Sequence, residues 1–339
     1  NFHFLITFFN DAKLWNYFSI YLPFPALKHE KMFTFAGKLH INNFSCIMAN
    51  VIKIKKGLDI NLKGKASDVL LNGGKSDSYA IVPDYYNGIL PKVVAKVGEK
   101  VKAGSVLMID KNRPEIKFVS PVSGEVTAVN RGEKRKVLSI VVKPDAQIEE
   151  FGKKNVASLQ GAEVKEVLLN AGMWPFIKQR PYDIVAAPLD TPRDIFVSAF
   201  YSAPLAPNFD FIVKGQEADF QTGLNALAKL TNGKVYVGVR SGSVVSGMKG
   251  VEIVEVEGPH PAANVGVQIN HIKPVNKGEV VWTVNPADVI VIGRLFNKGV
   301  ADFSRMVAIT GSETTERGYV KTISGCTIKS LVNGKVLGQ

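Results

Sequence analysis

Val97-Gly98-Glu99-Lys100-Val101-Lys102-Ala103-Gly104 opens the stretch that decides the fold, which runs from Pro91 to Pro144. Its second half contains Phe118-Val119-Ser120-Pro121-Val122-Ser123-Gly124-Glu125-Val126. In both halves valines alternate with polar residues, and each run stops at a glycine that can adopt the positive φ of a tight turn. Two such halves, the second opened by a Pro-Val-Ser-Gly bend, predict a small flattened β-barrel of short strands.

The turn between the two halves bears on a carrier function, because the pattern resembles the barrel-sandwich hybrid of biotinyl and lipoyl carrier domains. Such carriers display a modified lysine on an exposed turn. Here the turn is Ile109-Asp110-Lys111-Asn112-Arg113-Pro114-Glu115, and the Asn-Arg-Pro after Lys111 departs from the carrier pattern. We therefore interpret Lys111 as an ordinary solvated hairpin lysine and the barrel as structural. A cofactor attached to Lys111 is the alternative.

The composition of the 339 residues is that of a soluble globular protein with room for two or three domains. The formal net charge of +12 suits acidic partners or an anionic membrane surface. No nucleic-acid recognition motif accompanies it, so nucleic acid is not expected as a partner. The two cysteines, Cys46 and Cys326, provide neither a disulfide framework nor a thiolate site for zinc or an iron–sulfur cluster.

The first 47 residues differ from the rest because they are rich in aromatic side chains and keep no helical or strand period. Their apolar runs are broken at Asn10-Asp11, Pro23 and Pro25, short of the roughly 18 residues needed to span a bilayer. Regular patterning starts after Met48. We therefore expect Met48 to be the natural start and residues 1–47 to be a non-native or disordered extension. The alternative is an aromatic-rich, membrane-contacting extension.

Alternating predicted helices and strands follow the barrel. The expected helices are Ala162–Ala171, which ends at Gly172, and Glu217–Leu230. The expected strands are Asp194–Ala199, Lys234–Val239, Val251–Val256 and Val289–Ile292. This order predicts an open, Rossmann-like α/β sheet with helices on its faces. Three other strands are assigned to the barrel: Val51–Gly64 at its edge, Tyr79–Val82 and Leu90–Val97.

The end of the chain is typical of a β-grasp (SLBB-like) domain that is only begun. Two strands, Arg305–Gly311 and Tyr319–Ile323, precede a helix that starts within Gly325–Val332. We expect a fragment that lacks its C-terminal part. The predicted fold is thus an α+β multidomain chain with these divisions: 1–47 extension, 48–150 barrel-sandwich hybrid, 151–300 Rossmann-like domain and 301–339 β-grasp start.

Ligands of open α/β sheets bind beyond the carboxyl ends of the strands. Neither a Gly-x-Gly-x-x-Gly fingerprint nor a P-loop is present, but Gly258-Pro259-His260-Pro261 follows one predicted strand. His260 between two prolines has a stiff backbone and can present an imidazole to a ligand. The alternative is a rigid turn whose His260 bonds a backbone carbonyl. His271 and Trp282 lie on strand-like runs and are interpreted as core or edge residues.

Four motifs together resemble the NqrA family, whose members are subunits of the sodium-translocating NADH:quinone oxidoreductase. They are Lys55–Ile60, Ser120–Gly124, Gly258–Ala262 and the β-grasp start, and the resemblance covers roughly Met48–Gln339. The barrel motif is unspecific, since it recurs in carriers and in the RnfC subunits of Rnf-type electron-transport complexes. The Lys-Lys-Gly-Leu-Asp and Gly-Pro-His-Pro motifs are more specific.

The resemblance implies a peripheral subunit on the cytoplasmic face of the bacterial inner membrane, docked on integral subunits of a respiratory pump. That complex uses NADH, flavins, an iron–sulfur cluster and ubiquinone, and it exports sodium ions. This chain is expected to bind no cofactor or metal and to have no catalytic residues of its own. The predicted quinone- or partner-contacting residues are Gly258, Pro259, His260, Pro261, Trp174 and Phe176.

The flavin-bearing relatives of this domain order have a Gly-Gly-Ala-Gly-Phe-Pro type loop after the first helix. Here the loop is Asn170-Ala171-Gly172-Met173-Trp174-Pro175-Phe176. Met and Trp in place of glycines prevent the close backbone approach that a phosphate needs, so the nucleotide site is expected to be lost. An RnfC-type subunit, which would require cysteine clusters downstream of the β-grasp, is the alternative function. A biotin or lipoyl carrier is a third.

Overall fold

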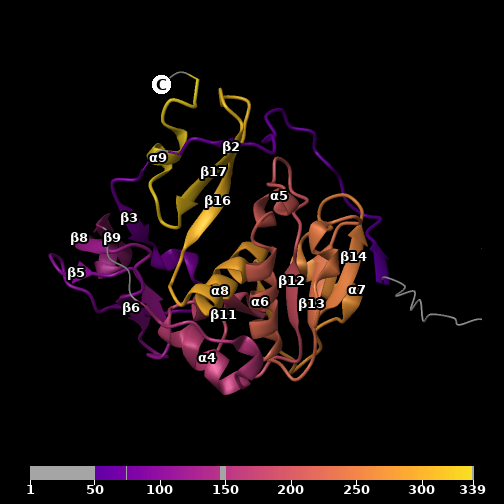
Figure 1. Ribbon diagram of the computed structural model, residues 1–339, viewed down its shortest axis with the longest axis horizontal. Helices are drawn as coiled ribbons and strands as arrows, with labels where there is room; N and C mark the ends of the chain where they lie inside the picture. The colour runs from indigo at the N-terminus through magenta and orange to yellow at the C-terminus, as the bar shows by residue number, and fades with distance from the viewer. Residues whose placement is uncertain (1–49, 74, 146–149, 338–339) are drawn as a thin grey trace, which may run out of the picture. The chain divides into compact units, whose positions relative to one another are not determined.

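The computed structural model describes residues 50–73, 75–145 and 150–337, which belong to one compact unit (Figure 1). The predictions for residues 1–47 lie outside these ranges. The described chain combines a β-barrel, an open α/β sheet and the start of a β-grasp domain. The predicted fold class is therefore confirmed.

The barrel consists of two small antiparallel sheets with the strand orders β3-β9-β8-β5 and β4-β6-β7. Its interior is apolar, and Leu107, Val126 and Ile140 are fully buried in it. The alternation of valines with polar residues in the sequence thus corresponds to inward and outward side chains. The strands are β3 (Tyr79–Ile81), β4 (Pro91–Val93), β5 (Lys100–Val101), β6 (Val106–Asp110), β7 (Lys117–Val119), β8 (Gly124–Arg131) and β9 (Val137–Pro144).

The central α/β sheet has seven strands in the order β1-β14-β13-β12-β15-β10-β11. The first five are parallel, whereas at the other edge β10 pairs antiparallel with both β15 and β11. All residues of β12 and β15 are buried, as expected for parallel strands covered on both faces. The strands are β1 (Asn50–Lys53), β10 (Ile177–Arg180), β11 (Ile184–Val185), β12 (Ile195–Ser198), β13 (Val235–Val239), β14 (Glu252–Glu257) and β15 (Val281–Val284).

Two helices, α6 (Glu217–Ala228) and α8 (Pro286–Lys298), lie side by side against this sheet (Figure 1). Glycines bring their backbones together. A Cβ atom at Gly293 would lie 1.7 Å from the Asp219 carbonyl oxygen, and one at Gly223 would lie 2.1 Å from that of Val289. The remaining α-helices of the described α/β region are α4 (Gly161–Asn170), α5 (Phe209–Val213) and α7 (Val265–Ile272), and three short 3-10 helices cover Val156–Ser158, Trp174–Phe176 and Val244–Gly247.

The β-grasp start contains the antiparallel pair β16 (Ser304–Ile309) and β17 (Gly318–Ile323), followed by α9 (Ile328–Val332). The two strands and the helix were predicted from the sequence. A third strand, β2 (Leu70–Leu71), pairs parallel with β17 and comes from the N-terminal part of the described chain.

Three local predictions are wrong. Val51–Gly64 is not at the barrel edge, because β1 pairs with β14 of the α/β sheet and the alternating pattern carries no information about a distant partner. Val289–Ile292 is helical, since Pro286 and the capping side chain of Asn285 start α8 upstream of this apolar run. His271 lies on helix α7, whereas Trp282 lies on strand β15 as predicted.

A buried carboxylate fixes the amino end of the central strand β12. Asp194 is 1% exposed, accepts hydrogen bonds from Arg193 Nε (2.7 Å) and the Lys234 backbone N–H (3.1 Å), and pairs with Lys273 Nζ (2.8 Å). Burial raises the pKa of this carboxyl group, but the bonds from Lys273, Lys234 and Arg193 outweigh that effect and lower the pKa overall. The ionised form therefore stabilises the fold.

Within residues 50–73, 75–145 and 150–337, every helix is too short or too polar to cross a membrane.

Candidate functional site

The two motifs that are most specific in the sequence meet at the carboxyl edge of the parallel strands. Gly258-Pro259-His260-Pro261 follows β14 directly, as predicted. The segment of residues 54–69, which we call the strap, leaves β1 beside it. Ile54 N–H donates to the Glu257 carbonyl (2.8 Å) and Leu58 N–H donates to the His260 carbonyl (2.9 Å).

Glycines allow this contact between the two backbones. A Cβ atom at Gly57 would lie 2.1 Å from the His260 carbonyl oxygen, and one at Gly258 would lie 2.2 Å from that of Ile54. Both residues also have a positive φ, +155° and +123° respectively. Gly57 is therefore required for contact with the Gly-Pro-His-Pro motif, and Gly258 for contact with the strap.

His260 is held from two sides. Its backbone N–H donates to Asp59 Oδ1 (2.8 Å), and its ring Nδ1 lies 3.1 Å from the Ser202 hydroxyl. Because that hydroxyl accepts from the Ala263 N–H (3.0 Å), its own proton is available to Nδ1. This arrangement favours the tautomer with the ring proton on Nε2, which leaves a donor for a ligand. The side-chain partner of His260 is thus a hydroxyl, not the backbone carbonyl of the alternative interpretation.

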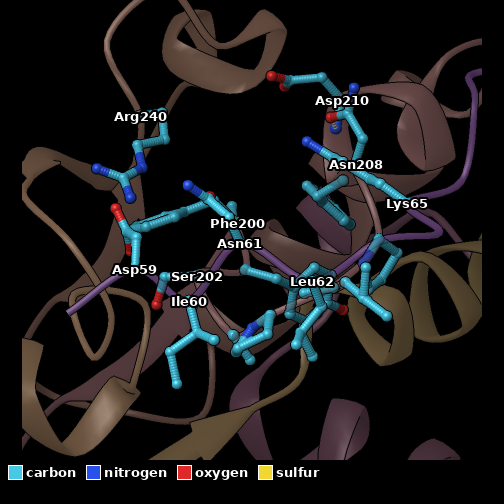
Figure 2. Close-up of a pocket in the computed structure, with 18 residues that line it drawn as sticks. Asp59, Ile60, Asn61, Leu62, Lys65, Phe200, Ser202, Asn208, Asp210 and Arg240 are labelled. Carbon is cyan, nitrogen blue, oxygen red and sulfur yellow. Dashed lines mark hydrogen bonds between the residues drawn. The ribbon is translucent and has the colours of Figure 1, made fainter. Parts of the chain in front are cut away.

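A cavity of about 400 Å³ adjoins this contact (Figure 2). The strap and the chain after β12 form its walls, and Asp59 and Ser202, the two partners of His260, are among the lining residues. Phe200 provides an aromatic surface, with the Arg240 guanidinium 4.6 Å from its ring centroid. The cavity thus combines apolar walls with the Arg240 cation and with Asp59 and Ser202, which position His260. His260 itself is adjacent to the cavity and is not one of its lining residues.

A second cavity, of about 600 Å³, lies between the carboxyl ends of β12 and β15. The chain runs outward from β12 to β14 and then returns to β15 on the other side of β12, so this is the switch point of the sheet. Phe200 and Tyr201 line both cavities, and Ala263 connects the second one to the His260 loop. Phe176, a predicted site residue, lines it too.

A partly buried ion pair lies beside Phe176. Arg305 on β16 pairs with Asp288 in the first turn of α8, and its guanidinium lies 5.4 Å from the Phe176 ring centroid. Burial, reinforced by the Asp288 carboxylate, raises the pKa of Tyr86 and of Tyr201 to about 12 each. Both phenols therefore keep their protons at neutral pH.

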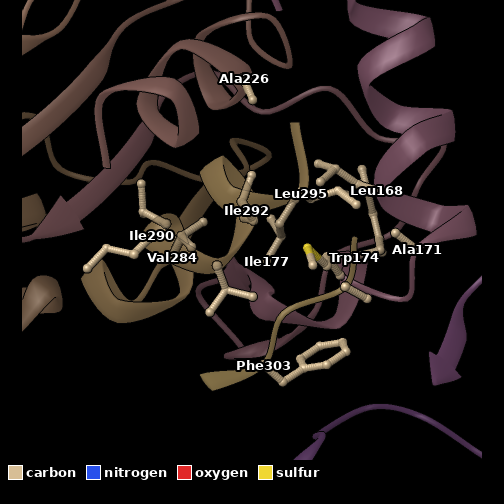
Figure 3. Close-up of a cluster of buried hydrophobic side chains, with 14 of the residues drawn as sticks. Leu168, Ala171, Trp174, Ile177, Ala226, Val284, Ile290, Ile292, Leu295 and Phe303 are labelled. Atoms are coloured by element: carbon tan, nitrogen blue, oxygen red, sulfur yellow. The ribbon is translucent and has the colours of Figure 1, made fainter. Parts of the chain in front are cut away.

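Trp174 lies apart from these cavities although it was predicted to contact quinone or a partner. Its side chain is fully buried, Nε1 donates to the Ala186 carbonyl (2.9 Å), and its ring meets that of Trp282 edge-on at 5.4 Å. Figure 3 shows it within the apolar core beside Ile177 and Ala171. The structure therefore gives Trp174 a packing role, and no surface through which it could touch a ligand.

The loop around Trp174 is filled rather than open. Met173 and Trp174 are both fully buried, and a Cβ atom at Gly172 would lie 2.4 Å from the Val119 side chain of the barrel. A phosphate needs backbone N–H groups that it can approach. Here the loop joins the α/β core to the barrel.

The turn that bears Lys111 is fixed against the α/β region. Arg113 pairs with Asp110 (2.8 Å) and donates to the carbonyls of Val185 (3.0 Å) and Gly88 (2.9 Å). The Lys111 backbone N–H donates to the Leu90 carbonyl (2.7 Å), while its side chain is exposed. A turn held in this way does not match the freely displayed turn of a carrier.

Within the part of the chain that the structure describes, no three His, Cys, Asp or Glu side chains lie close enough together to hold a metal ion. Asp59, Ser202 and Arg240 were not singled out from the sequence. Asp59 stands inside the Lys55–Ile60 motif, which is the one signal that pointed to it.

Comparison with known proteins assigns three parts of the chain to three family models. Residues 52–145 match the NqrA N-terminal barrel-sandwich hybrid domain, residues 159–301 the NqrA second alpha/beta domain, and residues 306–339 the NQRA C-terminal domain.

Whole-chain relatives agree with these models. The corresponding subunits of the Na(+)-translocating NADH-quinone reductase from Hahella chejuensis, Neisseria meningitidis and Photorhabdus laumondii are 37%, 34% and 35% identical to this chain. The alignments cover 84%, 85% and 84% of this chain and 65%, 66% and 65% of the relatives. The chain thus spans about 65% of the length of the curated relatives it matches.

Proposed function

The chain belongs to the NqrA family of Na(+)-translocating NADH-quinone reductase subunits, and from this premise we propose that it is a non-catalytic subunit on the quinone side of such a complex. In this role it is a peripheral protein on the cytoplasmic face of the bacterial inner membrane. It docks on the integral subunits of a pump that couples NADH oxidation and quinone reduction to sodium export.

The observation that supports a quinone-side role is the placement of His260. Asp59 fixes its backbone, Ser202 orients its ring, and a cavity with apolar and aromatic walls lies beside it. A quinone carbonyl needs a hydrogen-bond donor next to an apolar surface. The Nε2–H tautomer that Ser202 favours provides such a donor.

A structural role without a cofactor is supported by the filled loop at Gly172–Trp174. Core side chains occupy the place where related flavin-bearing chains expose glycine backbone. NADH, flavins and the iron–sulfur cluster are accordingly assigned to other subunits of the complex. The purified full-length protein should be colourless. A flavin or iron–sulfur absorption spectrum would instead support an Rnf-type redox subunit.

Replacing His260 with alanine should weaken the use of quinone by the assembled complex. Loss of one hydrogen bond of about 1–1.5 kcal/mol predicts a KM for quinone that rises about five- to twelvefold. His260→Gln, which keeps a side-chain donor, should recover part of the difference. The measurement is steady-state NADH:quinone reductase activity of the complex rebuilt with each variant.

His271→Ala is the matched control, because His271 lies on α7 and its Nδ1 contacts the Val267 carbonyl of the same helix (2.8 Å). Thermal unfolding should change little in His260→Ala, since the bonds to Asp59 and Leu58 use the His260 backbone. Equal KM values for the His260→Ala and His271→Ala complexes would leave His260 with a turn-forming role only.

A further inference from the structure

The strap displays large apolar side chains to solvent. Leu58, Ile60 and Leu62 are 71%, 55% and 54% exposed, although they lie within five residues of one another. Exposed apolar groups gathered in this way mark a surface that another molecule covers. The strap is also the rim of the smaller cavity, because Ile60 and Leu62 line it (Figure 2).

Backbone hydrogen bonds hold the strap in place on both sides of these exposed apolar side chains. Leu58 N–H donates to the His260 carbonyl on the α/β sheet, and the Gly64 carbonyl accepts from Gly311 N–H (2.9 Å) in the β-grasp region. Asp68 farther along accepts from Asn208 Nδ2 (2.9 Å). The apolar side chains are therefore presented by a tethered segment, so covering them costs little additional backbone ordering.

Lysines surround the apolar side chains. Lys55 and Lys56 precede Leu58, while Lys63 and Lys65 follow Leu62, and Lys55, Lys56, Lys63 and Lys65 are all exposed. None of the four forms an ion pair with another described residue. The two acids of the strap, Asp59 and Asp68, accept hydrogen bonds from the His260 backbone N–H and the Asn208 amide, and both keep their negative charge. With four lysines and two acids, the strap combines apolar side chains with a net charge of +2.

This composition differs from that of a typical protein interface. The centres of protein interfaces are enriched in aromatic residues and arginine and depleted in lysine. The strap contains four lysines and neither an aromatic residue nor an arginine. Aliphatic side chains flanked by lysines suit the boundary of an anionic bilayer, where the former enter the acyl region and the latter contact headgroups.

We propose that the strap is a lipid-contact site, at which Leu58, Ile60 and Leu62 insert shallowly into an anionic bilayer while Lys55, Lys56, Lys63 and Lys65 bind its headgroups. The proposal rests on the proposed function only in placing the chain at a membrane. It adds that the chain touches lipid directly, and that the rim of the cavity beside His260 faces the phase in which quinone dissolves.

The test is sedimentation of the full chain with vesicles of phosphatidylcholine, with or without phosphatidylglycerol. The chain should bind the vesicles that contain phosphatidylglycerol, and high salt should release it. Lys63→Gln/Lys65→Gln should lower partitioning by about 25-fold, about five-fold for each lysine. Leu58→Ser/Ile60→Ser/Leu62→Ser should lower it by at least about tenfold.

Matched controls lie outside the strap. Leu189 is 93% exposed, and Lys153 and Lys154 are exposed, so Leu189→Ser and Lys153→Gln/Lys154→Gln should bind vesicles as the unaltered chain does. All variants keep residues 1–47, so any binding by that segment is common to every arm.

Strap variants that bind vesicles as well as the controls would overturn the proposal. Loss of binding to partner subunits with unchanged vesicle binding would also overturn it and make the strap a protein-docking surface. Neither outcome depends on quinone, so failure here is distinguishable from failure of the His260 experiment.

Discussion

Gly293→Ala should destabilise the protein by about 3 kcal/mol, because α6 and α8 touch backbone to backbone at this glycine. The added Cβ atom would lie 1.7 Å from the Asp219 carbonyl oxygen and 2.9 Å from the Gly223 backbone nitrogen. Neither is the end of a flexible side chain, so the two helices must separate. Separation opens voids around buried side chains such as Leu224 and Val289. The measurement is urea unfolding, with a lower midpoint at an unchanged m-value.

Gly266→Ala is the matched control. Gly266 lies in the first turn of α7, and a Cβ atom there would meet no heavy atom of the described residues within 4 Å. That substitution should be neutral or stabilise the protein by up to about 1 kcal/mol, since alanine restricts the unfolded chain. Similar losses for Gly293→Ala and Gly266→Ala would show that the contact between α6 and α8 does not limit stability.

Asp194→Ala should cost about 3–5 kcal/mol, because it leaves the cations that surround a buried carboxylate without their partner. Arg193 and Lys273 would lose their anion, and the Lys234 backbone N–H would lose its acceptor. The exposed pair of Asp84 and Lys136, also 2.7 Å long, is the control, and Asp84→Ala should cost at most about 1 kcal/mol. Equal losses of unfolding free energy for Asp194→Ala and Asp84→Ala would show that burial does not strengthen the ion pairs of Asp194.

The same carboxylate predicts a pH dependence. The folded pKa of Asp194 lies below its unfolded value, so its contribution is complete above the unfolded pKa of about 3.9. This stabilising contribution of Asp194 is lost as the pH falls from the unfolded pKa through the lower folded pKa. In a series of thermal melts, the unaltered protein should therefore lose stability more steeply than Asp194→Ala in this acid range. Parallel curves would assign the acid sensitivity to other carboxyl groups.

The sequence predicts those parts of the fold whose signals are local. Alternating valines with glycine stops identify the barrel, and Phe220, Leu224 and Leu227 at helical spacing identify α6. The buried strands β12 and β13 are apolar runs of strand length, so they too were found. In each case the physical cause of the structure lies within about a dozen residues.

Features that join distant residues could not be predicted in this way. The bond from His260 N–H to Asp59 connects positions 201 residues apart, and nothing near either residue specifies the other. The cavity beside them is likewise formed by the strap and the chain after β12. Trp174 was misjudged for the same reason, since its burial depends on Trp282 and Ala186 across the sheet. The motifs indicated which residues matter, and the contacts among them emerged only in the structure.

The pairing of β1 with β14 and of β2 with β17 has a consequence for synthesis on the ribosome. The barrel strands are contiguous in sequence, so the barrel can fold as soon as β9 has emerged. Strands β1 and β2 emerge earlier, but β1 can pair only after β14 has been translated, and β2 only after β17. During that interval β1, the strap and β2 are an unpaired, partly apolar segment of the nascent chain. Closure of this edge of the α/β sheet therefore has to wait for β14, and until then the segment is exposed to wrong pairing or chaperone capture.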